Sequence, residues 1–226
     1  MTAPVFALIR HGDYAQRANT PSAHQPWPLT ELGKQQASQL AETLVNLASV
    51  YDWQLSETLY SSPLCRASQT AHILQTHWPV ASEVVEDAAL CERSLGAGNN
   101  LSVDEIEAAL TQDPRVTTWP ADWKSNSRFR VPLAGSESLL ESGERVAHWL
   151  QACDASTPDN TLVPVVGHGA AFRHAAYVLG ALAFDEIKAL SMYHAQPVCV
   201  QRIPDGGWTV VAGAWKVRAK QTEYRD

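Results

Sequence analysis

The chain has 226 residues, enough for one large domain or one domain with an insertion, and 45% of them are apolar, so it can bury a sizeable core. The net charge of −7 argues against nucleic acid or an anionic membrane as the main partner, although a local basic pocket for a small anion is compatible with it. The four cysteines form no CxxC pair, the N-terminus lacks a signal-peptide pattern, and no apolar run reaches the roughly 18 residues of a membrane helix. These features predict a cytoplasmic protein with reduced thiols.

The first predicted element is a buried strand over residues 5–9, which ends at Arg10-His11-Gly12. Gly12 allows a sharp turn there. The carboxyl ends of strands hold the ligand in open α/β sheets, so Arg10 and His11 are expected at that edge. A guanidinium offers paired charged donors, and an imidazole can attack phosphorus or move protons. The pair therefore suggests a phosphate ligand, although Arg-His-Gly also occurs by chance.

A long polar loop follows over residues 13–28 and contains three prolines. Loops of this length in compact domains are often functional. Thr30 is a suitable helix N-cap, and the alanines and leucines after it recur at the spacing of one helix face. The sequence predicts a helix that runs to about Ala48.

A second short strand is predicted over residues 58–61. Ser62 and Pro63 then read as the N-cap and first residue of a helix. Arg66 lies one turn into that helix, and helical side chains lean towards the N-terminus. Arg66 can thus point at the same place as the free N–H groups of the first turn, and together they would form an anion site.

Another strand is predicted at Val84-Val85, and Glu92 follows it shortly before a turn. Glu92 could project from a strand or loop into a cleft.

The pattern changes over residues 97–135, which carry prolines, scattered charge and one short helix opened by a capping box of Ser102 and Glu105. This segment does not resemble core, and we interpret it as an insertion that covers the site, a lid. Trp119 and Trp123 would either line the pocket of the lid or form a local core.

A second capping box at Ser138 predicts a helix to about Cys153. An apolar strand over residues 162–166 then leads to Gly167-His168-Gly169 and a helix over 170–179. This repeats the arrangement at Gly12, and two His-Gly strand ends in one sheet can converge on one site.

The last predicted strands, over residues 198–203 and 208–212, are joined by a hairpin. The chain from Lys216 onwards is predicted to be mobile.

Four motifs occur in order along the chain: Arg10-His11-Gly12, Ser62-Pro63-x-x-Arg66-Ala67-x-Gln69-Thr70, Glu92-Arg93 and Gly167-His168-Gly169. With them the chain resembles the histidine phosphatase superfamily, the phosphoglycerate-mutase-like group with the RHG motif, over roughly residues 5–180. The resemblance implies one α/β domain over residues 1–226. It would be a three-layer α/β/α sandwich with a mostly parallel central sheet and a lid insertion at about 97–135.

The resemblance also implies roles for individual residues. His11 would be the nucleophile that takes the phosphoryl group, and Glu92 the general acid that protonates the leaving oxygen and then helps to activate water. Glu86 is a rival for the acid role, but the Glu-Arg-x-x-Gly context favours Glu92. The residues that would bind the phosphate are Arg10, Arg66, His168, Gly12 and Gly169, with His168 also counted as catalytic. Two arginines and a second histidine supply positive charge, so no metal and no cofactor is expected.

The chain departs from one branch of the family. Mutases and many small-metabolite phosphatases have Asn six residues after the histidine, where this chain has Arg17. Gln16 and Asn19 are candidates to replace it. The Asp13-Tyr14 pair that follows the RHG motif looks more like the phosphohistidine and protein-phosphatase branches. Tyr14, Gln16, Asn19 and Ser62 form the set of substrate-binding candidates. His24 and His194 are weaker candidates for a site role.

The sequence favours a metal-independent phosphomonoesterase that works through a phosphohistidine, acting on a small phosphorylated metabolite. Three alternatives stay open: a phosphoglycerate mutase, a phosphohistidine or protein phosphatase, and a non-catalytic phosphate-binding module. The altered stretch after Gly12 argues against the mutase, and the lid argues for an enclosed pocket. A homodimer is left open.

Overall fold

The computed structural model describes residues 3–80 and 82–218. Within them a seven-stranded sheet has the order β4-β3-β5-β1-β7-β8, with β2 beside β5. The strands β1 to β5 pair in parallel, and β7 and β8 add antiparallel strands at one edge. The strand bounds are β1 Val5–Arg10, β2 Gln54–Leu55, β3 Thr58–Ser61, β4 Glu83–Glu86, β5 Thr161–Gly167, β7 Pro197–Arg202 and β8 Trp208–Gly213.

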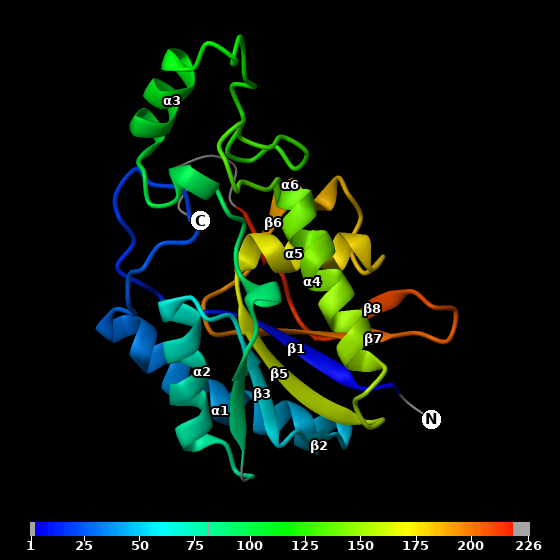
Figure 1. Ribbon diagram of the computed structural model, residues 1–226. Coiled ribbons are helices and arrows are strands. Elements are labelled where there is room, and N and C mark those ends of the chain that lie inside the picture. The colour runs from blue at the N-terminus through cyan, green and yellow to red at the C-terminus, as the bar shows by residue number, and fades with distance from the viewer. Residues whose placement is uncertain (1–2, 81, 219–226) are drawn as a thin grey trace.

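Helices cover both faces of this sheet (Figure 1). The helices α1, Glu31–Tyr51, and α2, Cys65–His77, lie on one face, and α4, Leu139–Asp154, and α5, Gly169–Val178, lie on the other. The alternation of side chains along β1 explains why both faces need cover: Val5, Ala7 and Ile9 pack with α1 and α2, whereas Phe6 and Leu8 pack with α4 and α5. The predicted three-layer architecture with a mostly parallel sheet is confirmed.

The helix α1 forms where its cap and apolar stripe predict it. The Thr30 hydroxyl accepts a hydrogen bond from the Gly33 N–H, and the buried residues recur three and four apart. The helix extends to Tyr51, three residues beyond the predicted end, and stops at Asp52, which has a left-handed conformation.

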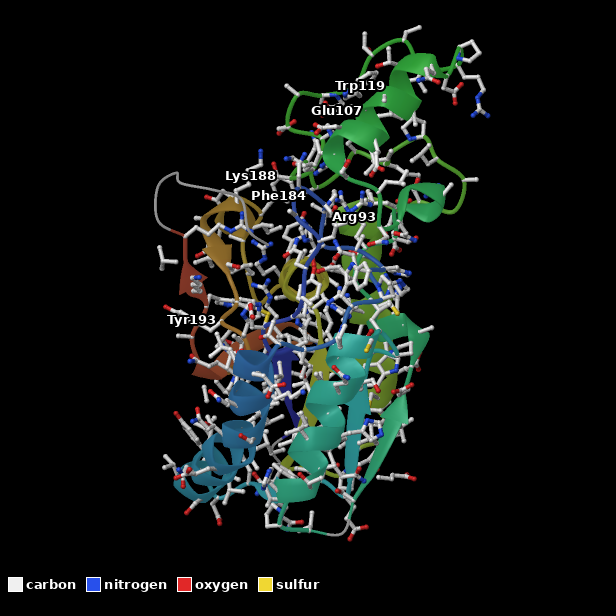
Figure 2. The ribbon with its side chains drawn as sticks, turned by 90° about the vertical axis from the view of Figure 1, so that its left-hand side faces the viewer. Arg93, Glu107, Trp119, Phe184, Lys188 and Tyr193 are labelled. Atoms are coloured by element: carbon white, nitrogen blue, oxygen red, sulfur yellow. The ribbon has the colours of Figure 1, made fainter. Side chains whose placement is uncertain are left out.

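Residues 96–137 form a segment that projects beyond the ends of the sheet strands (Figure 1). It begins at the short 3-10 helix η2, Gly96–Gly98, and carries α3, Val103–Gln112, which opens with the predicted capping box. Figure 2 shows Glu107 and Trp119 on this segment and Arg93 at its base. The segment packs on a small core that it shares with Ala23 of the long loop and with Leu95; its own members are Ile106, Leu110, Trp123 and Val131, with Trp119 packed against them. The two tryptophans therefore belong to a local core.

Two local predictions are wrong. The helix α2 begins at Cys65 and not at Pro63, and its N-cap residue Leu64 makes no side-chain cap. The Ser62 hydroxyl accepts from the Leu64 N–H, outside the helix, and also contacts His168. A tertiary contact thus replaces the helix cap that local sequence favoured.

The other error concerns the end of the chain. Lys216–Val217 form β9, which pairs with β6, Leu190–Ser191, directly after the short helix α6, Glu186–Ala189. The prediction of a mobile segment from Lys216 fails for this strand, and residues 219–226 lie outside the described part. Neither periodicity nor turn chemistry marks a two-residue strand.

A second 3-10 helix, η1 at Ala88–Leu90, follows β4 and leads to Glu92. Within the described ranges, no helix is long and apolar enough to cross a bilayer.

Candidate active site

The two His-Gly motifs meet at neighbouring strand ends. Strand β1 pairs in parallel with β5, with Arg10 opposite Gly167, and the His11 N–H donates to the Gly167 carbonyl at 3.0 Å. His168 follows as the N-cap residue of α5. The ring centres of His11 and His168 lie 5.2 Å apart. The predicted convergence of the motifs therefore exists in the structure.

Gly12 packs the site against α1. A Cβ at Gly12 would lie 2.5 Å from the Gly33 carbonyl oxygen, so only glycine fits this approach. The Gly12 N–H donates to the Thr70 hydroxyl at 3.0 Å. Gly12 stays a predicted phosphate-binding residue, and in the structure its N–H holds the turn against α2.

The hydrogen bonds of His11 determine which nitrogen carries the proton. Nδ1 lies 2.7 Å from the Gly12 carbonyl oxygen, which can only accept, so Nδ1 carries the hydrogen. Arg66 Nε lies 3.0 Å from His11 Nε2, and a guanidinium can only donate, so Nε2 presents its lone pair. His11 is thus a neutral imidazole with a bare Nε2, which is the nucleophilic form.

Arg66 is fully buried at the centre of the site and donates in four directions. In addition to His11, its guanidinium contacts the carbonyl oxygens of Ala23 at 2.9 Å and Gln25 at 3.2 Å, and His168 Nδ1 at 3.1 Å. Both carbonyls belong to the long loop 13–28. The loop therefore orients the guanidinium towards the two histidines.

His168 is the tautomer with its proton on Nε2, whereas His11 carries its proton on Nδ1. Its Nδ1 accepts from Arg66, so the hydrogen is on Nε2, which donates to the Ser62 hydroxyl at 2.9 Å. His168 is fully buried. Burial and the charge of Arg66 hold the pKa of His168 well below its ordinary value, as they do the pKa of His11.

Arg10 lies beside the two histidines at the end of β1. It is 9% exposed, and its Nη1 donates to the Met192 carbonyl. A Cβ on Gly169 would lie 3.3 Å from Arg10 Cδ, so this glycine lets the arginine side chain pass close to the start of α5.

Glu92 lies at the N-terminus of α5 and is 3% exposed. Its carboxylate accepts from the N–H groups of Ala171 at 3.1 Å, Ala170 at 3.3 Å and Arg93 at 3.0 Å. A carboxylate at this position is favoured by the helix dipole and its free N–H groups. The rival Glu86 is exposed on β4.

With this geometry established, comparison with known proteins identifies the family. The model of the histidine phosphatase superfamily, branch 1, matches residues 6–216. The chain belongs to the histidine phosphatase superfamily. A 2,3-bisphosphoglycerate-dependent phosphoglycerate mutase of Chelativorans sp. (strain BNC1) is 28% identical over 203 residues, which cover 88% of this chain and 92% of the mutase.

Solved structures share the histidine phosphatase fold. A protein titled mycobacterial hydrolase 1 matches with a TM-score of 0.72 at 23% identity, over 96% of this chain and 100% of that chain. A mycobacterial glucosyl-3-phosphoglycerate phosphatase matches with a TM-score of 0.70 at 23% identity, over 92% of this chain and 97% of that chain.

The four substrate-binding candidates separate into two groups in the structure. Tyr14 joins the site: its ring stands edge-on to His11 at 5.1 Å, and the Arg66 guanidinium lies 4.7 Å from its centre. Ser62 joins it through His168. Gln16 instead bonds to the Thr20 carbonyl within the loop.

Asn19, the fourth candidate, contacts the projecting segment. Its amide donates to Asp104 at 3.0 Å, and its carbonyl accepts from the Val103 N–H at the start of α3. It thus ties the long loop to the projecting segment. Gln16 and Asn19 stay candidates to replace the family asparagine, and their side chains bond to the Thr20 carbonyl and to Asp104.

Sequence reasoning missed the residues that shape the loop around Arg66. Gln25 is fully buried, donates through its amide to the Pro21 carbonyl, and presents its own carbonyl to Arg66. Thr70 stands in the motif that runs from Ser62 to Thr70, but the sequence assigned it no role; its hydroxyl donates to the Arg66 carbonyl and accepts from the Gly12 N–H. No sequence pattern marks Gln25.

Both weaker histidine candidates lie near the site. His24 Nε2 contacts the Glu92 carbonyl at 2.8 Å. The His194 ring is centred 5.7 Å from that of His11, and burial lowers the pKa of His194 to about 3. Among the described residues, no three metal-ligating side chains gather into a metal site.

Proposed function

We propose that this histidine phosphatase is a metal-independent phosphomonoesterase that transfers the phosphoryl group of a small phosphorylated metabolite to His11 Nε2. The observation that carries the proposal is the state of His11. Its Nδ1 is anchored to the Gly12 carbonyl, and its bare Nε2 faces a buried guanidinium. A neutral, oriented imidazole with positive charge in front of it is the arrangement that in-line attack on phosphorus requires.

The charge that develops on the phosphoryl oxygens would be stabilised by Arg66 and Arg10. Both arginines are buried or nearly so, and fixed donors in a dry site act more strongly than donors in water. An entering phosphate would take over the N–H groups that Arg66 now gives to the two histidines.

Glu92 would first protonate the leaving oxygen and then activate the water that hydrolyses phosphohistidine. In the structure both oxygens of Glu92 accept hydrogen bonds from backbone N–H groups, which suits the ionised carboxylate that would activate the water. The substrate oxygen would approach it beside the first turn of α5.

The alternatives require different behaviour from the same residues. A phosphoglycerate mutase, the activity named for the Chelativorans relative, would have to protect phosphohistidine from water. A protein phosphatase would need an open pocket, whereas His11, Arg66 and His168 are each at most 1% exposed. A binding module would have no use for a nucleophile and a carboxylic acid at the same site. A small phosphomonoester is therefore the preferred substrate class.

The test is phosphate release from a panel of phosphomonoesters in the presence of EDTA. The panel contains an aryl phosphate, phosphoglycerates, sugar phosphates, nucleotides and a phosphopeptide. We expect turnover that disappears in His11→Ala and persists in His148→Ala, a control at an exposed histidine of α4. Unchanged release in His11→Ala would overturn the nucleophile assignment. Isomerisation of phosphoglycerate without net release would favour the mutase.

A further inference from the structure

His11 and His168 each direct an unprotonated ring nitrogen at the guanidinium of Arg66. The guanidinium of Arg66 donates through Nε to His11 Nε2 and through Nη2 to His168 Nδ1. A guanidinium has five donors and no acceptor, so each imidazole must offer a lone pair. A phosphoryl group that enters here meets two lone pairs as well as the arginines.

Two lone pairs repel the oxygens of an anion, so at least one of the two nitrogens must gain a proton when the anion binds. His11 needs its lone pair for the attack, and its Nδ1–H is already committed to the Gly12 carbonyl. His168 Nδ1 is the remaining position.

Ser62 makes this position available. Its oxygen accepts from the Leu64 N–H at 3.2 Å and from His168 Nε2 at 2.9 Å, which leaves its own proton for Cys91 Sγ at 3.5 Å. Ser62 therefore acts as an acceptor for Nε2–H in both the neutral and the protonated imidazole. Any added proton goes to Nδ1, on the side of the anion.

We propose that binding of a phosphate-like dianion is coupled to the uptake of one proton at His168 Nδ1, and that Ser62 is the positioning residue that directs the proton there. The inference rests on the proposed function only in placing the anion between the two histidines. The balance is simple: the free protein, the dianion and one proton from solvent give a complex in which imidazolium Nδ1–H donates to an anion oxygen.

The surroundings of His168 agree with this. The charged and titratable groups that face it are Arg10 of β1, His11, His24 of the long loop, Arg66 of α2, Cys91 across Ser62, Glu92 beside the next N–H groups, and Arg145 of α4. The arginines oppose a proton on His168 in the free protein. A bound dianion offsets their charge and favours the proton, which raises the pKa of His168 in the complex.

Sulfate tests the inference without turnover, because it remains a dianion at neutral pH and cannot itself carry the proton. Its Kd is measured by calorimetry between pH 6.5 and 8.5, in buffers of different ionisation enthalpy that contain no phosphate. We expect uptake of about one proton and a Kd that rises towards tenfold per pH unit, the limit for one proton.

Two variants identify the protonated residue. His168→Gln offers an amide N–H that needs no proton, so its sulfate Kd should no longer depend on pH, whereas His11→Gln should keep the dependence. The reverse result would place the proton on His11 and overturn the inference. A Kd of the wild type that does not change with pH would also overturn it. Sulfate that does not bind at all would contradict the proposed phosphate pocket itself.

The role of Ser62 has its own pair of variants. Ser62→Ala removes the acceptor of the imidazolium and should weaken sulfate binding at pH 6.5 by about tenfold, the effect of losing a charged buried hydrogen bond. Ser62→Thr keeps the hydroxyl and should restore binding to within a few-fold. Equal binding by the alanine variant and the wild type would show that Ser62 does not position His168.

Discussion

The Glu92 carboxylate accepts from two N–H groups at the start of α5, those of Ala170 and Ala171, and from the Arg93 N–H. If it is the general acid, Glu92→Gln keeps the shape of the site and removes the proton. Turnover of alkyl phosphates should fall on the order of 10²- to 10⁴-fold, and turnover of activated aryl phosphates much less, because a good leaving group needs no proton. Comparison of kcat for both ester types measures this.

Glu86→Gln is the matched control, since Glu86 is exposed on β4 and should leave both ester types unchanged. An equal loss on both esters in Glu92→Gln would contradict the acid role.

At the scale of single residues, prediction from sequence succeeds where strand ends determine position. Arg10, His11 and His168 follow buried strands, and parallel neighbours bring such residues together. It fails for Ser62, whose local sequence favours a helix cap but whose hydroxyl is taken by His168. It also fails for the backbone carbonyls of Ala23 and Gln25 that bind Arg66, because every residue has a backbone carbonyl and the residue type does not reveal its partner.

At the scale of elements, the site depends on how closely α1 approaches the turn after β1. A Cβ at Gly33 would lie 1.9 Å from the Asp13 carbonyl oxygen, and both partners are backbone. Gly33→Ala should therefore move α1 or the turn that carries His11, with a loss of about 1–3 kcal/mol of unfolding free energy or more. The rate of phosphate release should also fall, because a shift of about 1 Å at a catalytic group can lower the rate about 100-fold.

Urea unfolding and phosphate release measure the two effects of Gly33→Ala. Gln39→Ala, at an exposed position of the same helix, serves as the control and should change neither. A Gly33→Ala protein with normal stability and activity would show that the contact is not needed.

The same scale separates predictable from unpredictable elements. The helix α1 has a cap, a stripe and a long enough period to be read from sequence, and the capping box of α3 places that helix inside a segment of irregular composition. The strands β6 and β9 have two residues each and exist only because they pair with each other. The fold class was therefore predictable from the long elements, but the pairing of its C-terminal strands was not.

At the scale of the whole molecule, several histidines are buried in their neutral form. Burial and nearby arginines lower the pKa of His11 and His168 well below 6.5, and burial lowers the pKa of His174 to about 4 and that of His194 to about 3. In the unfolded chain these groups take up protons below about pH 6.5, whereas in the folded protein they do not. The unfolded state then binds more protons, so the unfolding free energy falls as the pH falls below 6.5.

We expect urea unfolding to give a constant free energy contribution from these histidines above about pH 7.5 and a decrease between pH 6.5 and 5, with up to about 1.4 kcal/mol per pH unit from each. His174→Gln isolates the contribution of one histidine that has no proposed catalytic role and whose ring forms hydrogen bonds with the Ala170 carbonyl and the Ser127 hydroxyl. Its profile should be flatter than that of the wild type by the share of one histidine. Equal slopes in both proteins would show that His174 is protonated in the folded state as readily as in the unfolded chain.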